Sequence, residues 1–152
     1  MKIKRGFWGL SFLLIFFLSL SAGCAQSETP LNSTTVTTTS QTADIPTIST
    51  ADAYNLILKN KGNPDFVIID VRTADEFSSG YIAGAVNIDY YAADFKANID
   101  KLDKNRQYLI YCRTGIRGAA AVQIMLELGF QKTQNITGGI TMWIQDSYPT
   151  VK

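Results

Sequence analysis

The chain has 152 residues, which is enough for one domain of ordinary size and an additional segment. Its formal charge is +1, and once the three basic residues nearest the amino terminus are left out, 11 basic and 13 acidic residues remain, so no basic surface for nucleic acid is expected. The complete absence of histidine excludes a Ser-His-Asp or Cys-His catalytic arrangement and any histidine-ligated metal site, and we expect neither a metal nor a cofactor.

The first part of the chain is typical of a leader. Lys2, Lys4 and Arg5 form a basic start, and a mostly apolar run of 14 residues follows at positions 7–20. A membrane-spanning helix needs about 20 residues, so this run is short for a span and suits the core of a signal peptide.

The residues that follow resemble the lipobox of bacterial lipoproteins, because small residues directly precede a cysteine. Ser21, Ala22 and Gly23 lead into Cys24, although Ser21 departs from the leucine most common at its position. The resemblance implies lipid attachment to the Cys24 thiol, acylation of the new amino terminus with palmitate-type chains, cleavage after Gly23, and an extracytoplasmic location on a bacterial membrane. An ordinary cleaved signal peptide with an incidental Cys24 is the alternative.

Three segments are therefore expected. Residues 1–23 form a signal peptide, residues 24–45 a lipidated cysteine with a Thr- and Ser-rich tether, and residues 46–152 the globular domain. The tether cannot bury enough apolar surface to offset the entropy lost on ordering. A spacer that holds the domain off a membrane and an inert tail predict the same sequence.

Helices and strands are expected to alternate in the globular part. In chain order, the sequence predicts a helix capped by Ser49 that ends near Gly62, a strand at 66–69, a short helix between Thr73 and Gly80, a strand at 85–88, a helix near 94–102, a strand at 108–111, a helix at 118–128, a strand at 133–136 and a short helix at 140–145. Capping-box patterns mark the first two helices, and continuous apolar runs indicate strands buried on both faces. The alternation predicts an open, mostly parallel α/β sheet.

One thiol is left for the mature chain. The sequence holds two cysteines, and if Cys24 carries lipid, Cys112 has no partner and is a candidate reactive group. A small buried apolar residue is the alternative. However, Cys112 directly follows a predicted buried strand, at the edge of the sheet where ligand sites of open α/β folds lie.

The residues after Cys112 suit an anion. They lead into the amino terminus of a predicted helix, whose free N–H groups and dipole stabilise negative charge. Arg113 and Arg117 add positive charge, Gly115 allows a tight curl, and Thr114 offers a hydroxyl. We therefore expect the loop to stabilise the Cys112 thiolate and to bind a charged sulfur species.

The hexapeptide Cys112-Arg113-Thr114-Gly115-Ile116-Arg117 resembles the active-site loop of single-domain rhodaneses, the thiosulfate sulfurtransferase family. Residues 70–77 and 80–88 resemble the Asp-Val-Arg and Gly-His-Ile-x-Gly-Ala motifs of that family, with Tyr81 in place of the usual histidine. Residues 138–140, with Trp143 and Pro149, resemble its carboxyl end. The similarity covers about residues 47–152.

This resemblance implies a five-stranded, mostly parallel sheet flanked by helices and a reaction by double displacement. The Cys112 thiolate would take a sulfane sulfur from a donor such as thiosulfate, and a thiol or cyanide would then remove it from the persulfide. The substrate-binding residues would be Arg113, Thr114, Gly115, Ile116 and Arg117. A monomer is expected.

Other residues have structural interpretations. Asp70 and Arg72 end a predicted strand near the site, and Arg72 is expected to pair with Asp75 or Glu76. Trp143 and Phe130 are expected in the core. The segments at 32–34 and 135–137 match N-glycosylation acceptors, which the bacterial-type leader makes coincidental.

Three rival functions remain open. Cysteine phosphatases hold Cys and Arg with five intervening residues, whereas four lie between Cys112 and Arg117, which makes a smaller cradle. A silent rhodanese-like module would bind a partner without turnover. An envelope persulfide carrier would use the same Cys112 with a protein acceptor.

Overall fold

Five strands form one sheet in the order β1-β5-β4-β2-β3 in the computed structural model, which describes residues 44–152. Every pair of neighbouring strands is parallel, which confirms the expected α/β fold. The strands are β1 (Thr47–Ile48), β2 (Phe66–Asp70), β3 (Ala85–Asn87), β4 (Gln107–Tyr111) and β5 (Thr133–Ile136). The predicted signal peptide and most of the predicted tether lie outside the described residues.

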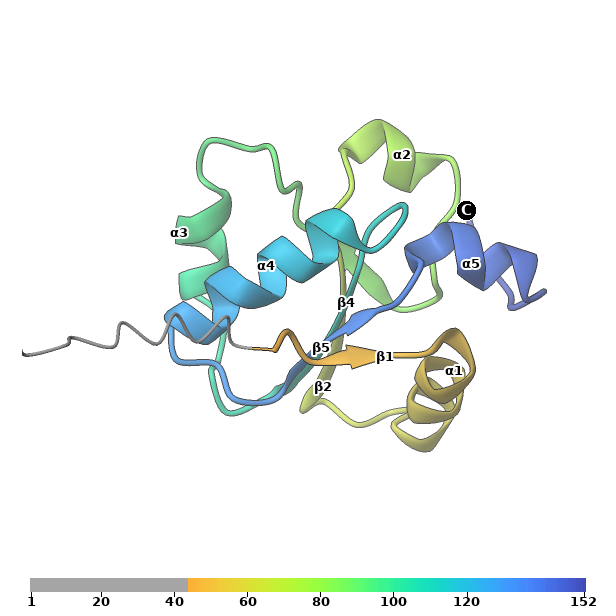
Figure 1. Ribbon diagram of the computed structural model, residues 1–152, viewed down its shortest axis with the longest axis horizontal. Coiled ribbons are helices and arrows are strands. Elements are labelled where there is room, and N and C mark those ends of the chain that lie inside the picture. The colour runs from red at the N-terminus through yellow and green to blue at the C-terminus, as the bar shows by residue number, and fades with distance from the viewer. Residues whose placement is uncertain (1–43) are drawn as a thin grey trace, which may run out of the picture. The chain divides into compact units, whose positions relative to one another are not determined.

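Helices cover both faces of the sheet (Figure 1). They are α1 (Thr50–Lys59), α2 (Ala74–Ser78), α3 (Phe95–Asp100), α4 (Ile116–Glu127) and α5 (Gly139–Gln145). Residues of α3 and α4 share one apolar cluster with the sheet, and residues of α1 and α5 share the other. Between residues 44 and 152, no helix has the length and apolar character needed to cross a membrane.

The apolar runs of β2 and β4 supply side chains to both clusters, because successive residues of a strand point to opposite faces. Ile69 and Ile110 lie in the cluster of α3 and α4, whereas Leu109 lies in that of α1 and α5. Phe130 and Trp143 are buried as expected, one in each cluster. Burial of each such side chain contributes about 1.5–3 kcal/mol.

The caps of two helices follow the sequence patterns closely. Thr73 and Glu76 form the predicted capping box at the start of α2. Ser49 caps α1 by accepting a hydrogen bond from the N–H of Asp52, but the Asp52 carboxylate accepts from the Ser49 hydroxyl rather than its backbone N–H.

Two elements differ from the expectation. The strand β1 has only two residues and carries no pattern of its own; it forms because β5 offers it a pairing edge, where Asn135 and Thr137 donate backbone hydrogen bonds to Pro46 and Ile48. The helix α4 begins at Ile116, two residues before the predicted start, so the last two residues of the predicted loop, Ile116 and Arg117, are helical.

Candidate functional site

Cys112 directly follows β4 at the carboxyl edge of the sheet, within what we call the cysteine loop (residues 112–117). Its side chain is buried, and the backbone N–H of Gly115 donates a hydrogen bond to its Sγ at 3.1 Å. Gly115 has φ +95°, a left-handed conformation that costs glycine little. This conformation turns the Gly115 amide back onto the sulfur, where it can stabilise negative charge.

The start of α5 holds the first half of the cysteine loop. The N–H groups of Ile140 and Thr141 donate to the carbonyl oxygens of Cys112 and Arg113 at 2.9 and 3.0 Å. A Cβ on Gly139 would lie 2.3 Å from the Cys112 oxygen, so this contact requires glycine. Sequence reasoning treated the double glycine as a turn and missed that it supports the backbone of Cys112 and Arg113.

Three side chains of the cysteine loop face solvent: those of Arg113, Thr114 and Ile116. Ile116 is 78% exposed. Arg113 makes no ion pair with any residue from 44 to 152. Its guanidinium is therefore available to an anionic ligand.

Arg117, by contrast, is held by Glu76. Its two terminal nitrogens donate to the two carboxylate oxygens at 2.7 and 2.8 Å, and its guanidinium lies 5.4 Å from the ring centre of Tyr91. The hydrogen bond from Arg117 is the main reason that the pKa of Glu76 falls from 4.5 to about 2. The pKa of Arg117 is raised, chiefly by Glu76 and to a smaller extent by the nearby Cys112 thiolate. The positive charge thus stays beside the sulfur, although Glu76 occupies one edge of the guanidinium.

The expected pairing of Arg72 with Asp75 or Glu76 is wrong. Arg72 instead turns back onto the buried carboxylate of Asp70 at 2.6 Å and also donates to the Gly80 carbonyl at 2.7 Å. A carboxylate at the end of β2 and a guanidinium two residues later satisfy one another inside the protein, where neither could remain unpaired.

This buried pair lies under the residue that precedes the cysteine. Arg72 is 5.8 Å from the ring centre of Tyr111, and the Tyr111 hydroxyl accepts from the N–H of Ile82 at 3.1 Å. Burial, with the charge of Asp70, raises the pKa of Tyr111 and keeps its hydroxyl protonated. Asp70 and Arg72 therefore support the strand end and do not contact Cys112 Sγ directly by any hydrogen bond in the described part of the chain.

Asn135 is a site residue that sequence reasoning missed. It lies in β5, is 3% exposed, and its side-chain Nδ2 donates to the carbonyl oxygen of Gly115 at 3.0 Å. The only signal in the sequence was the glycosylation-like pattern at 135–137, and burial of the amide agrees with reading that pattern as coincidental.

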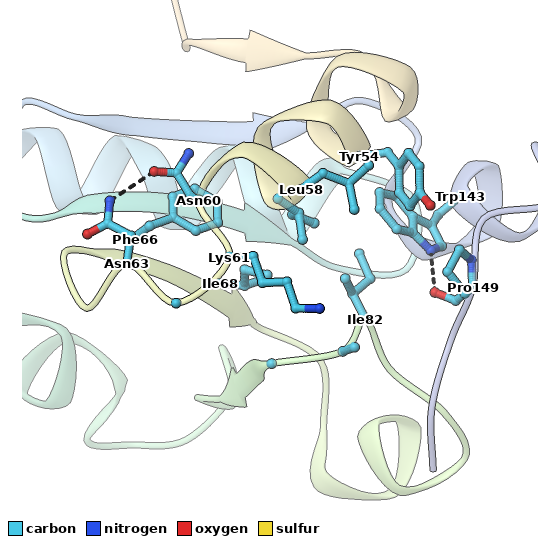
Figure 2. A pocket seen from close by; sticks show the side chains of 14 residues that line it. Tyr54, Leu58, Asn60, Lys61, Asn63, Phe66, Ile68, Ile82, Trp143 and Pro149 are labelled. Atoms are coloured by element: carbon cyan, nitrogen blue, oxygen red, sulfur yellow. Dashed lines mark hydrogen bonds between the residues drawn. The ribbon is translucent and has the colours of Figure 1, made fainter.

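A groove of about 470 Å³ lies elsewhere, between the end of α1 and the segment that enters β3. Figure 2 shows Tyr54 and Trp143 at one end and Asn60 and Asn63 at the other. Lys61 is the one charged residue of its lining, and no residue of the cysteine loop takes part. The groove therefore contains no cysteine and lies apart from the cysteine loop.

Known proteins resemble this chain over the part that carries the cysteine loop. The family model of the rhodanese-like domain matches residues 50–146. A sulfurtransferase of Allochromatium vinosum is 26% identical over 104 residues, which make up 68% of this chain and 95% of the relative. The thiosulfate sulfurtransferase GlpE of Coxiella burnetii is 32% identical over 96 residues, 63% of this chain and 84% of the relative. The crystal structure of a rhodanese-related protein from Thermoplasma volcanium superposes with a TM-score of 0.60 at 31% identity, covering 70% of this chain and 97% of that one.

Proposed function

Because the chain belongs to the rhodanese-like domain family, we propose that it is a sulfurtransferase that moves a sulfane sulfur from a donor such as thiosulfate to a thiol or cyanide. The observation that carries the proposal is the hydrogen bond from the Gly115 amide to Cys112 Sγ at the carboxyl edge of the sheet. A thiolate at this position is the nucleophile that such a transfer needs, and no histidine base is required once the thiolate has formed.

The transfer has two displacement steps. The Cys112 thiolate attacks the outer sulfur of thiosulfate, a new S–S bond forms, and the old S–S bond breaks with release of sulfite. An acceptor thiolate or cyanide then attacks the outer sulfur of the Cys112 persulfide, and the Cys112 thiolate leaves. No external oxidant or reductant is consumed.

The neighbouring residues have distinct roles in this proposal. Arg113, which is exposed and unpaired within the described residues, binds the oxyanion end of the donor. Arg117 supplies fixed positive charge beside the sulfur while Glu76 orients it. The Thr114 hydroxyl and the backbone N–H groups from Arg113 to Arg117 bind the outer sulfur.

Mass spectrometry of the purified protein after exposure to thiosulfate tests the proposal. We expect the peptide that contains Cys112 to gain one sulfur atom, about 32 Da, and Cys112→Ser to abolish the gain. An unmodified Cys112 in the folded protein would refute sulfur transfer from this donor.

Turnover assays separate the rivals. Thiocyanate production from thiosulfate and cyanide supports an enzyme, whereas a Cys112 persulfide that forms without turnover indicates a persulfide carrier. Hydrolysis of a phosphate ester without any persulfide would indicate a phosphatase. The four-residue spacing between Cys112 and Arg117 favours sulfur over phosphate because the enclosed space is small.

We also propose that the protein is a lipid-anchored envelope protein. The basic start, the apolar run of 14 residues and Cys24 support this proposal. Labelled palmitate should be incorporated into the intact protein in a bacterial host, and Cys24→Ser should prevent both incorporation and membrane fractionation. Incorporation that survives Cys24→Ser would contradict it.

A further inference from the structure

We infer that Asn135 is a positioning residue that aims the Gly115 amide at Cys112. The inference rests on the proposed role of Cys112 as the sulfur-carrying nucleophile. It adds a residue of β5 outside the cysteine loop, and it assigns that residue an effect on sulfur reactivity rather than on stability alone.

Both backbone polar groups of Gly115, its N–H and its carbonyl oxygen, form hydrogen bonds. Its N–H donates to Cys112 Sγ at 3.1 Å, and its carbonyl oxygen accepts from Asn135 Nδ2 at 3.0 Å and from the N–H of Ala119 at 2.9 Å. The bond from Ala119 is an ordinary helical bond and ties Gly115 to α4 only. The bond from Asn135 ties it to the sheet, and Cys112 is itself attached to the end of the sheet. Asn135 therefore sets the position of the amide relative to the sulfur.

The amide of Asn135 can face only one way. If it were turned over, Oδ1 would oppose the Gly115 carbonyl oxygen, and two acceptors would meet without a proton between them. In the observed orientation Oδ1 is buried and finds no hydrogen-bond donor in the described part of the chain. A Cβ on Gly118 would lie 2.1 Å from this oxygen, so the first turn of α4 leaves room for the amide by carrying glycine.

An unpaired buried oxygen makes Asn135 a poor choice for stability, because such a group loses its hydration without compensation. A leucine side chain has a similar shape and leaves no polar atom unpaired. What asparagine offers at this position is therefore its side-chain N–H donor. That donor bonds Gly115, the residue whose own N–H donates to the sulfur.

The prediction separates stability from reactivity. In Asn135→Leu the Gly115 carbonyl loses its hydrogen bond to the sheet, so the N–H of the same residue is held less firmly toward Cys112 Sγ and the thiolate is less well stabilised. We expect the pH profile of Cys112 alkylation by iodoacetamide, followed on the Cys112 peptide by mass spectrometry, to shift to higher pH. The rate at neutral pH should fall about tenfold, while urea unfolding shows no loss of stability.

Thr133→Val is the matched control. Thr133 lies in the same strand and is 2% exposed, and its buried hydroxyl makes no hydrogen bond to Gly115 or to any other residue from 44 to 152. Its replacement should leave the alkylation profile unchanged. Should Asn135→Leu fail to fold, Asn135→Thr replaces it, because its side chain is too short to reach the Gly115 oxygen and suits a strand.

The outcomes are distinguishable. A shifted alkylation profile in the Asn135 variant and not in Thr133→Val supports the inference, and unchanged profiles in both overturn it. Because alkylation reports on the thiol directly, this result does not depend on thiosulfate as donor. If the unaltered protein formed no persulfide, the proposed function would fail while the alkylation comparison still decided the role of Asn135.

Discussion

Replacing Gly118 with alanine sets local helix preference against the packing described for Asn135. Gly118 lies in the first turn of α4, and a Cβ there would lie 2.1 Å from Asn135 Oδ1 and 3.1 Å from its Cγ. Ordinary contact begins at 3.4 Å, so the amide would have to withdraw by roughly 1.3 Å. Because the amide is enclosed by β5, α4 and the cysteine loop, it cannot withdraw without breaking its bond to Gly115.

The magnitude follows from three effects. Alanine is favoured over glycine inside a helix by about 1 kcal/mol, which acts to stabilise Gly118→Ala. Overpacking a filled site costs about 1–3 kcal/mol, and the lost hydrogen bond of Asn135 costs about 1 kcal/mol more. We therefore expect a net loss of about 1–3 kcal/mol in the free energy of unfolding, together with slower alkylation of Cys112.

Urea unfolding followed by circular dichroism measures the change, and Ala120→Gly in the same helix serves as the reference. Ala120→Gly should lower the free energy of unfolding by about 1 kcal/mol through helix preference alone, with no change in the alkylation of Cys112. If Gly118→Ala were instead more stable than the unaltered protein, the close approach of Asn135 to α4 would be wrong, and with it the enclosure of the amide.

Three further predictions concern the supports of the site. Glu76→Gln should lower the free energy of unfolding by about 1–2 kcal/mol at neutral pH after allowance for solvent screening. Because Arg117 lowers the pKa of Glu76 from 4.5 to about 2, the stability from this pair is present above pH 4.5 and is lost as pH falls through about 2. The variant should not show this loss on acid titration. Asp70→Asn should cost about 3 kcal/mol in urea unfolding because it leaves the charge of Arg72 buried without a counter-charge. Gly139→Ala, at φ +56°, should cost about 3 kcal/mol and reduce persulfide formation, since its Cβ would collide with two loop carbonyls.

Each of these predictions has a result that would contradict it. Equal acid titration curves for the unaltered protein and Glu76→Gln would mean that the carboxylate gains nothing from Arg117. A stable Asp70→Asn would mean that Arg72 reaches solvent. Normal persulfide yield in Gly139→Ala would mean that α5 does not hold the cysteine loop.

Much of the fold could be predicted from local patterns. The continuous apolar runs at 66–69 and 108–111 indicated strands buried on both faces, and β2 and β4 confirm this. The Thr73 and Glu76 pattern located the start of α2 to the residue, since a capping box acts within one turn. The strand β1 escaped prediction because two residues cannot show a period, and it exists only through its bonds to β5.

The candidate site was predictable only where its residues are close in sequence. The loop from Cys112 to Arg117 is continuous, so its glycine, its charges and its place before a helix could be read together. The partner of Arg117 lies 41 residues away, and that of Gly115 lies 20 residues away. Such partners are chosen by the packing of α2 and β5 against the loop, which no local pattern contains.

The contact between α5 and the cysteine loop has a consequence for a chain that is still being made. The donors to the Cys112 and Arg113 carbonyls come from Ile140 and Thr141, which are synthesised after the cysteine loop. A nascent or truncated chain that ends before them would carry Cys112 without these two hydrogen bonds to its loop. Under the proposed function, Cys112 would then act on sulfur only after α5 has packed against its loop, and an unfinished or unfolded chain would carry an ordinary thiol.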